Sequence, residues 1–264
     1  MNNTNIAKLI FSAFIFTLLV SGTSFATSRN LLPRFPEIIL EKGFSENFEV
    51  TDCIAKVRIV DDTAQATLKV TLKNCSDKTI KSSAKFRILY PTSVNQIRIK
   101  VNDKAINYDR NSPRHIFELG KNESITFKLS AKTDINYSID SVREALRKQN
   151  EEHQAKGKKF DLSGLMKLFE REKFGKRFLI GPLVSKWGIF PLNFSKVDLE
   201  VIVPSDFTIV SQAADKWNKR NKNRESTYTY SDSEGFDGTV FLPETDKEEF
   251  VKTQKILTSS EFMH

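Results

Sequence analysis

The sequence predicts a mainly β protein, with one or more antiparallel β-sandwiches, a helical insertion and a C-terminal helix. Three observations support this fold class. Short segments of alternating apolar and polar residues follow one another along the chain, with turn residues between them. Helical spacing replaces this alternation over residues 138–177. Strand alternation resumes over residues 178–244, and helical spacing appears again after residue 245, where the last helix is expected.

The chain is organised around residues 53–75, which predict a β-hairpin. Side chains alternate along a strand, so each of its two strands has one apolar face. The residues on these faces are Cys53, Ala55, Val57 and Ile59 in the first strand, and Ala66, Leu68, Val70 and Leu72 in the second. A four-residue turn at residues 61–64 pairs Ile59 with Ala66 and gives every apolar residue an apolar partner.

The only two cysteines, Cys53 and Cys75, lie at the outer ends of this hairpin. With the four-residue turn, Cys75 lies about 10 Å beyond the position opposite Cys53. A disulfide needs Cα atoms within about 7 Å of each other. A bulge near Asn74, or a two-residue turn at residues 63–64, would allow both the apolar pairing of the hairpin and a short distance between the two cysteines. We therefore expect a Cys53–Cys75 disulfide with an irregularity beside it.

Residues 1–26 predict a signal peptide. Lys8 precedes an apolar run over residues 9–20, and Ser24-Phe25-Ala26 supplies small residues at the two positions that a signal peptidase reads. A run of about 12 residues is too short to cross the bilayer as a helix. The alternative is a buried N-terminal strand or helix. We expect a mature chain that begins near Thr27 and is periplasmic or secreted, in a compartment that favours the disulfide.

Composition bounds the function only loosely. The formal net charge is +8, and loss of Lys8 with the signal peptide would lower it by one. A basic surface favours anionic partners, although a charge of this size also serves solubility. The 21 Phe residues supply enough apolar material for one large domain or two small ones.

Four segments follow the expected signal peptide. The sequence predicts a β-sandwich domain over residues 27–137, a basic helical insertion over residues 138–177, a second β region over residues 178–244, and a C-terminal helix or tail over residues 245–264. Whether the two β regions form one sandwich or two stays open.

Three shorter segments depart from strand alternation. Residues 30–43 contain two prolines and predict an extended lead-in. Residues 213–225 are highly charged and lack an apolar face, which predicts a long loop. Thr245-Asp246-Lys247-Glu248 has the spacing of a capping box, in which the Thr hydroxyl and the Glu carboxylate satisfy amides at a helix start.

Residues 50–135 resemble the vault and inter-alpha-trypsin (VIT) type of β-sandwich domain. The segments that carry the resemblance are residues 57–60, 66–72, the turn Asn74-Cys75-Ser76-Asp77-Lys78, residues 86–91 and residues 97–106. The resemblance implies a sandwich architecture and a tendency toward protein interaction, and no activity. The Asp-x-Ser-x-Ser metal motif of the von Willebrand type domain that often accompanies this family is absent.

Motifs for metal or cofactor chemistry are missing from the sequence. None of the histidines has a partner at the spacing of a metal site: His115, His153 and His264. An acidic loop with Asp232, Glu234 and Asp237 misses the spacing of an EF-hand. Nucleophile-elbow and phosphate-loop patterns do not occur. We expect no cofactor, no metal and no enzymatic activity.

Ser82 and Lys85 match the Ser-x-x-Lys pattern of serine acyl transfer. The pattern works on a helix, where residues i and i+3 share a face. This segment predicts a strand, which sends the two side chains to opposite faces. We therefore assign no catalytic role to the pair.

The strongest functional candidate in the sequence is a group of cations in the helical insertion. Clustered cations beside an amphipathic helix can hold the phosphate groups of an anionic membrane or polymer. The alternative is a solvated charged linker, because Glu151, Glu152, Glu170 and Glu172 lie among or just before these cations. The candidate anion-binding residues are Lys156, Lys158, Lys159, Lys167, Arg171, Lys173, Lys176 and Arg177.

These observations predict an exported, non-enzymatic β-sandwich protein that acts as a protein-binding or assembly module. One alternative is association with an anionic membrane or polymer surface through the basic insertion. Another is a hydrolase with an unrecognised carboxylate site. Export disfavours nucleic acid as a partner. The partner's identity and the oligomeric state stay open.

Overall fold

The structure is a computed structural model, and it describes residues 35–40, 48–87, 95–107, 114–135, 176–181, 183–186, 193–233, 236 and 238–258. The expected signal peptide and most of the helical insertion lie outside these residues. Every described strand belongs to one compact unit, formed by residues 33–137 and 175–244. Helix α4 (Lys247–Thr258) belongs to a second unit. Among the described residues, no helix has the length and apolar character needed to cross a membrane.

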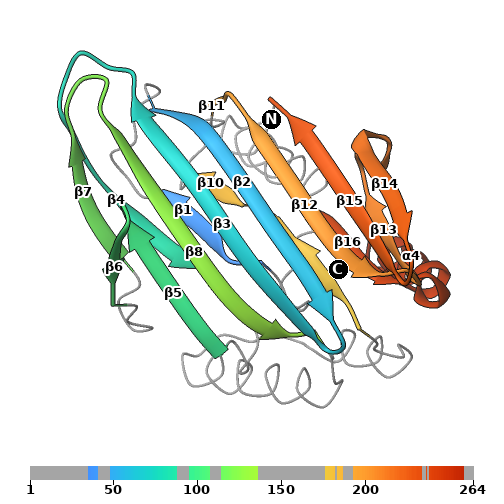
Figure 1. The fold of residues 1–264 in the computed structure, drawn as a ribbon. Coiled ribbons are helices and arrows are strands. Elements are labelled where there is room, and N and C mark those ends of the chain that lie inside the picture. Colours follow the sequence, from blue (N-terminus) through green and yellow to red (C-terminus); the bar gives the residue numbers. More distant parts are fainter. Residues whose placement is uncertain are drawn as a thin grey trace, which may run out of the picture. The chain divides into compact units, whose positions relative to one another are not determined.

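A nine-stranded sheet is the largest element of the fold (Figure 1). Its strands are β2 (Phe48–Val60), β3 (Thr63–Asn74), β5 (Asn95–Val101), β6 (Lys104–Ile106), β8 (Ser124–Asp134), β11 (Asn193–Phe194), β12 (Val197–Pro204), β14 (Trp217–Lys222) and β15 (Glu225–Asp232). They run in the order β14-β15-β12-β2-β3-β8-β5-β6, and β11 also pairs with β2.

Two smaller sheets complete the β unit. The four-stranded sheet has the order β10-β1-β4-β7, and the three-stranded sheet has the order β13-β16-β9. Their bounds are β1 (Glu37–Leu40), β4 (Ile80–Arg87), β7 (Arg114–Leu119), β9 (Phe178–Ile180), β10 (Val184–Lys186), β13 (Phe207–Ser211) and β16 (Thr239–Pro243).

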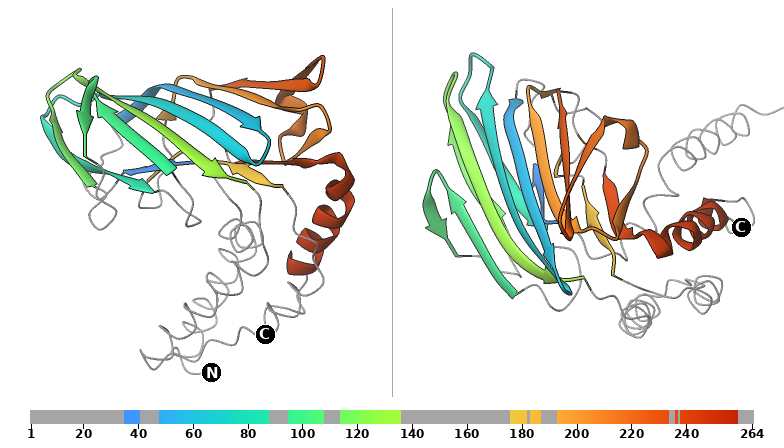
Figure 2. Two further views of the ribbon diagram at one scale, coloured as in Figure 1. Left: turned by 60° about the horizontal axis from the view of Figure 1, so that its bottom comes forward. Right: turned by 45° about the vertical axis from the view of Figure 1, so that its right-hand side comes forward.

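The four-stranded sheet packs on one face of the nine-stranded sheet (Figure 2). The ring of Phe127 in β8 lies edge-on to Phe86 of β4 and to Phe117 of β7, with centroids 5.8 and 5.7 Å apart. Alternate residues of β2 and β3 are buried and form part of the same apolar core. The mainly β fold with a sandwich and a C-terminal helix is therefore confirmed.

The two β regions of the sequence share the nine-stranded sheet, because β12 pairs in parallel with β2. The register runs from Val197 opposite Cys53 to Ile202 opposite Arg58. Parallel strands need a long crossover connection, so local sequence patterns do not reveal such a pair. The other described exceptions to an antiparallel arrangement are β1 with β10 and β2 with β11.

The central hairpin has a shorter turn than expected. Val60 pairs with Thr63, so the turn consists of two residues, and Ile59 lies opposite Ala64 rather than Ala66. Asp61 takes a positive φ of 52° there, a conformation that Asp tolerates in tight turns. The bulge lies in β2 between Val50 and Asp52, not near Asn74. The predicted register was therefore wrong.

The predicted Cys53–Cys75 disulfide is also wrong, since both cysteines are free thiols. Cys53 lies opposite Val70, and Cys75 follows five residues later, roughly 16 Å along the strand direction. That separation is far beyond the reach of a disulfide. Cys53 is buried, and loss of solvent, with a smaller effect of the Asp52 charge, raises the pKa of its thiol to about 12.

Two segments predicted to lack strands contain them. Residues 213–225 include a 3-10 turn (Ala214–Lys216) and β14, which forms a hairpin with β15. Trp217 is the buried anchor of β14, while the five residues after it are exposed. An edge strand commonly carries charges that discourage further pairing, which hides the strand pattern. In the lead-in, β1 is buried along its whole length and so shows no alternation.

The C-terminal helix begins differently from the predicted capping box. A 3-10 turn (Glu244–Asp246) precedes α4. The Thr245 hydroxyl lies 3.1 Å from Asp246 Oδ1, where the capping box would have it accept a bond from a helix amide. The helix was predicted correctly, but its first turn was not.

Asn74, at the end of β3, connects the β3–β4 turn to the β7–β8 turn from a fully buried position. Its Nδ2 lies 2.8 Å from the Lys78 carbonyl oxygen and 3.0 Å from the carbonyl oxygens of Leu119 and Gly120. Its Oδ1 accepts hydrogen bonds from the amide and hydroxyl of Ser76, at 2.9 and 2.7 Å. One amide side chain thus replaces water for several buried polar groups.

We expect Asn74→Leu to lower the free energy of unfolding by about 2–4 kcal/mol, because buried carbonyls lose their donor. Urea denaturation followed by circular dichroism measures this change. Asn193→Ala is the control, since Asn193 is exposed, and it should change stability by less than about 0.5 kcal/mol. Equal stability of the Asn74→Leu variant and the unmodified protein would contradict the role of this network.

Candidate functional site

Two of the eight candidate anion-binding residues lie within the described part of the chain, and neither is a free surface cation. Arg177 is only 1% exposed, so its guanidinium is part of the interior. Lys176 Nζ lies 2.7 Å from Asp62 Oδ1, and the hydrogen bond raises the pKa of this lysine. The other six residues lie outside the described residues, and their role stays a prediction.

The Ser-x-x-Lys match lies on β4, as the alternation predicted. Ser82 is buried together with Ala84 and Phe86 on one face, whereas Lys85 belongs to the other face. The lysine therefore cannot take a proton from the Ser82 hydroxyl. His115 lies in β7 with its ring edge-on to Phe127, and partial burial lowers its pKa.

Metal ligands are not gathered in the part of the chain that the structure describes: no group of three or more His, Cys, Asp or Glu residues there could hold an ion. Asp232 belongs instead to a structural contact, where its Oδ2 lies 2.5 Å from Lys216 Nζ and accepts a hydrogen bond from the Tyr230 hydroxyl at 3.0 Å. Glu234 and Asp237 lie outside the described residues.

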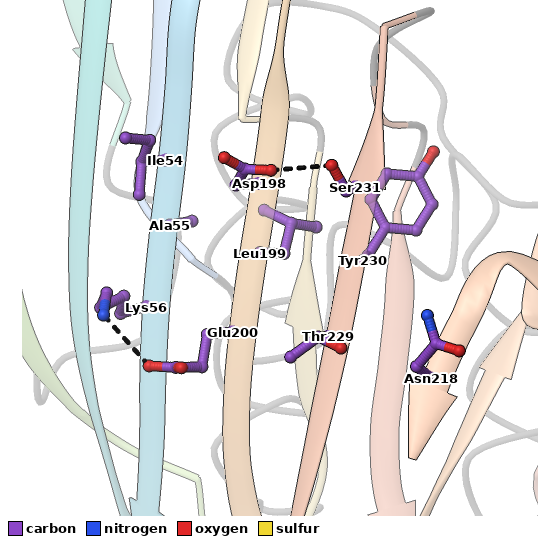
Figure 3. A pocket seen from close by; sticks show the side chains of 10 residues that line it. All are labelled: Ile54, Ala55, Lys56, Asp198, Leu199, Glu200, Asn218, Thr229, Tyr230 and Ser231. Atoms are coloured by element: carbon purple, nitrogen blue, oxygen red, sulfur yellow. Dashed lines mark hydrogen bonds and ion pairs between the residues drawn. The ribbon is translucent and has the colours of Figure 1, made fainter. Parts of the chain in front are cut away.

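A depression of about 340 Å³ lies on the nine-stranded sheet, over four neighbouring strands (Figure 3). β2, β12, β15 and β14 follow one another in the sheet, and each contributes to its lining. The lining residues are Ile54, Ala55, Lys56, Asp198, Leu199, Glu200, Asn218, Thr229, Tyr230 and Ser231. Most of the polar ones are the outward residues of strands whose alternate positions are buried.

Strand register brings these polar side chains into two rows. In the first row, Glu200 lies between Lys56 and Thr229, and Asn218 lies next to Thr229. In the second row, Asp198 lies between Ile54 and Ser231. Side chains directly opposite on one face are close enough to interact. The depression thus collects groups that are distant in the sequence.

Both carboxylates of the depression are paired with lysines. Lys56 Nζ lies 3.2 Å from Glu200 Oε1, and Lys196 Nζ lies 2.7 Å from Asp198 Oδ2. The Ser231 hydroxyl donates to Asp198 Oδ1 at 2.8 Å. The hydrogen bonds from Lys196 and, to a lesser extent, from Ser231 hold the pKa of Asp198 below its usual value. Both signs of charge are therefore presented, together with hydroxyl and amide groups.

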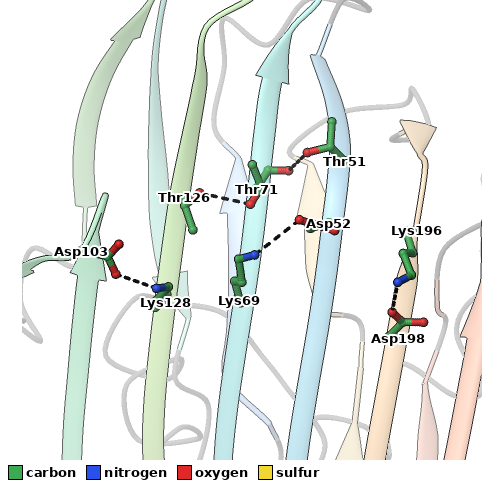
Figure 4. A network of polar contacts seen from close by, with 9 residues as sticks. All are labelled: Thr51, Asp52, Lys69, Thr71, Asp103, Thr126, Lys128, Lys196 and Asp198. Carbon is green, nitrogen blue, oxygen red and sulfur yellow. Dashed lines mark hydrogen bonds and ion pairs between the residues drawn. The ribbon is translucent and has the colours of Figure 1, made fainter.

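Polar contacts continue across the rest of this face (Figure 4). Thr71 and Thr126 share a hydrogen bond of 3.1 Å between β3 and β8. Lys69 Nζ lies 3.5 Å from Asp52 Oδ2, and Lys128 Nζ lies 2.6 Å from Asp103 Oδ1. We call this polar side of the nine-stranded sheet, opposite its buried side, the outer face. Its chemistry suits recognition of a polar surface.

The sequence indicated which residues point outward but not which of them meet. Lys56 and Asp198 already opposed the apolar faces of their strands in the alternating pattern. Their strands are joined by a parallel pairing across more than a hundred residues of chain, for which the sequence offers no local signal. Asn218 was missed because its strand was predicted to be a loop.

Comparisons with known proteins add little to this geometry. No family model matches the chain, and no curated protein matches it. A solved structure of a candidate nutrient-binding protein from Legionella pneumophila is similar over 87% of this chain and 76% of that chain, with 8% sequence identity and a TM-score of 0.45. A likeness this loose does not carry a fold assignment or a function to this chain.

The Lys196–Asp198 contact predicts a pH effect of known sign. The folded-state pKa of Asp198 is lowered, so the pair stabilises the fold above the unfolded pKa and loses this effect as pH falls through the folded pKa. We expect Lys196→Gln to raise the pKa of Asp198 toward the ordinary value of about 3.8.

A carboxyl-carbon NMR titration measures this pKa directly. Lys132→Gln is the control, because Lys132 lies on β8 and forms no described contact with Asp198. It should leave the titration of Asp198 unchanged. An identical pKa in the Lys196→Gln variant and the unmodified protein would show that Lys196 does not hold the carboxylate.

Proposed function

We propose that this chain is an exported binding module whose outer face holds a protein partner. The observation that carries the proposal is the depression, where polar groups from four adjacent strands converge on a sheet face. Donors, acceptors and both signs of charge lie there together. Such a mixture suits the polar surface of another protein.

The form of the depression favours a protein over a small molecule. Small-molecule sites are concave, mostly apolar and bury most of their ligand. Here the walls are side chains that stay in water: Lys56 is 63% exposed and Glu200 is 43% exposed. A side chain that protrudes from a partner can fill the depression, while the surrounding outer face supplies a polar rim.

The predicted signal peptide supports the exported part of the proposal. The alternative of anionic-surface association rests on the six candidate cations outside the described residues, because Arg177 is buried and Lys176 is paired. The hydrolase alternative would need a carboxylate available for proton transfer. Both carboxylates of the depression are engaged by lysines, which favours binding over that chemistry.

Site-specific photo-crosslinking in the cell that makes the protein tests the proposal. A benzophenone amino acid replaces Thr229 or, in a second variant, Asn218, both of which line the depression. We expect the same discrete protein adduct from both positions, because both would face the same partner. The control position is Lys78, an exposed residue in the turn after β3.

Position dependence decides the outcome of this experiment. An adduct from Thr229 and Asn218 that is absent from the Lys78 variant would support a partner on the outer face. Equal adducts from all three positions, or none from Thr229 and Asn218, would overturn the proposal.

A further inference from the structure

Five cations gather on the outer face over β3, β8 and β5, next to the strands that form the depression. We call them the cationic patch: Lys69, Arg98, Lys100, Lys128 and Lys132. Lys69 and Lys128 are seen side by side on neighbouring strands in Figure 4. Arg98, Lys100 and Lys132 are exposed, and Lys69 and Lys128 are partly exposed.

Register concentrates the charge of the patch. Lys128 lies directly opposite Lys69 on one side and directly opposite Lys100 on the other. Three lysines therefore form one row across three adjacent strands, about 4.8 Å apart in the pairing direction. Like charges directly opposite in a sheet are destabilising. The sheet itself gains nothing from this row, which favours a role outside the fold.

The patch has fewer anions than cations. Lys69 contacts Asp52 and Lys128 contacts Asp103. In the described part of the chain, Arg98, Lys100 and Lys132 form no ion pair within 4 Å. The pKa of Asp103 is lowered chiefly by the hydrogen bond from Lys128, with smaller effects of the Lys100 and Lys69 charges. The patch therefore already binds the Asp103 carboxylate, and Arg98, Lys100 and Lys132 remain available to bind carboxylates of a partner.

We propose that the cationic patch docks an extended acidic segment of the protein partner, with Asp or Glu at alternate positions. Side chains on one face of an extended chain repeat at about 6.7 Å, which is also the repeat along each strand of the sheet. Arg98 and Lys100 are one such repeat apart, and Lys128 and Lys132 are two. The inference rests on the proposed function and names the chemistry of the partner.

An anionic membrane fits the patch less well. Its uniform negative charge would meet Asp52 and Asp103 among the lysines. The patch also lacks an apolar anchor: the only exposed large hydrophobic residues in the described part of the chain are Val60 and Ile116, and neither belongs to it. A polypeptide can place its carboxylates between these acidic groups, whereas a lipid surface cannot.

Fluorescence anisotropy with a labelled peptide of alternating Glu and Ser tests the proposal. The variant Lys69→Gln/Lys100→Gln/Lys128→Gln removes the row. The control Lys78→Gln/Lys81→Gln/Lys222→Gln removes the same charge from exposed sites outside the patch. We expect the dissociation constant to rise at least about fivefold in the first variant and by less than about twofold in the control. Added salt should weaken binding by the unmodified protein.

Two further probes test the spacing and the kind of partner. A peptide of equal composition with Glu-Glu-Ser-Ser repeats should bind more weakly than the alternating peptide. Equal binding of the two peptides, equal loss in the control variant, or no binding to the unmodified protein would overturn the proposal. Tighter binding to phosphatidylserine vesicles than to the peptide would overturn it in favour of a membrane.

The crosslinking experiment separates this inference from the function on which it rests. If the Lys69→Gln/Lys100→Gln/Lys128→Gln variant still gives the adduct from Thr229, the binding module stands and the acidic partner is wrong. If the protein with its patch intact gives no adduct from Thr229, the proposed function itself fails. Loss of the adduct only in the variant supports both.

Discussion

The parallel pairing of β2 with β12 is the contact on which the rest of the structure depends. It joins residues 53–58 to residues 197–202, so that both halves of the β unit contribute strands to the nine-stranded sheet. Through β12 it also attaches β15 and β14 to the remainder of the sheet. The depression lies over these strands, so the same pairing that completes the core also creates the candidate site.

Local strand patterns predicted much of the fold, because a half-buried strand alternates apolar and polar residues. β2, β3, β8 and β12 all carry this signal, and all lie near their expected positions. Two strands were missed by the sequence prediction, for opposite reasons. β1 is buried on both faces, and β14 is an edge strand that is exposed after Trp217. Neither environment produces alternation.

Such local patterns do not reveal strand register or contacts between residues that are distant in the sequence. The observed hairpin turn is two residues shorter than the predicted one, which left every apolar face intact but increased the offset between Cys75 and Cys53 from about 10 Å to roughly 16 Å. The pattern therefore could not decide the disulfide. The same limit applies to the site: Lys56 and Glu200 point outward in their own strands, but only the register shows that they meet. Arg177 was misjudged because sequence charge does not reveal burial.

Disulfide trapping across β2 and β12 tests the central pairing most directly. Lys56→Cys with Glu200→Cys, in a Cys75→Ser background, places two thiols at directly paired positions on the exposed outer face. Neighbouring strands bring such Cα atoms to about 4.8 Å, within disulfide reach. Lys56→Cys with Ile202→Cys is displaced by two residues and should stay reduced. Rapid intramolecular oxidation of the first pair alone is the predicted result, and oxidation of the second pair, or of neither, would contradict the parallel pairing.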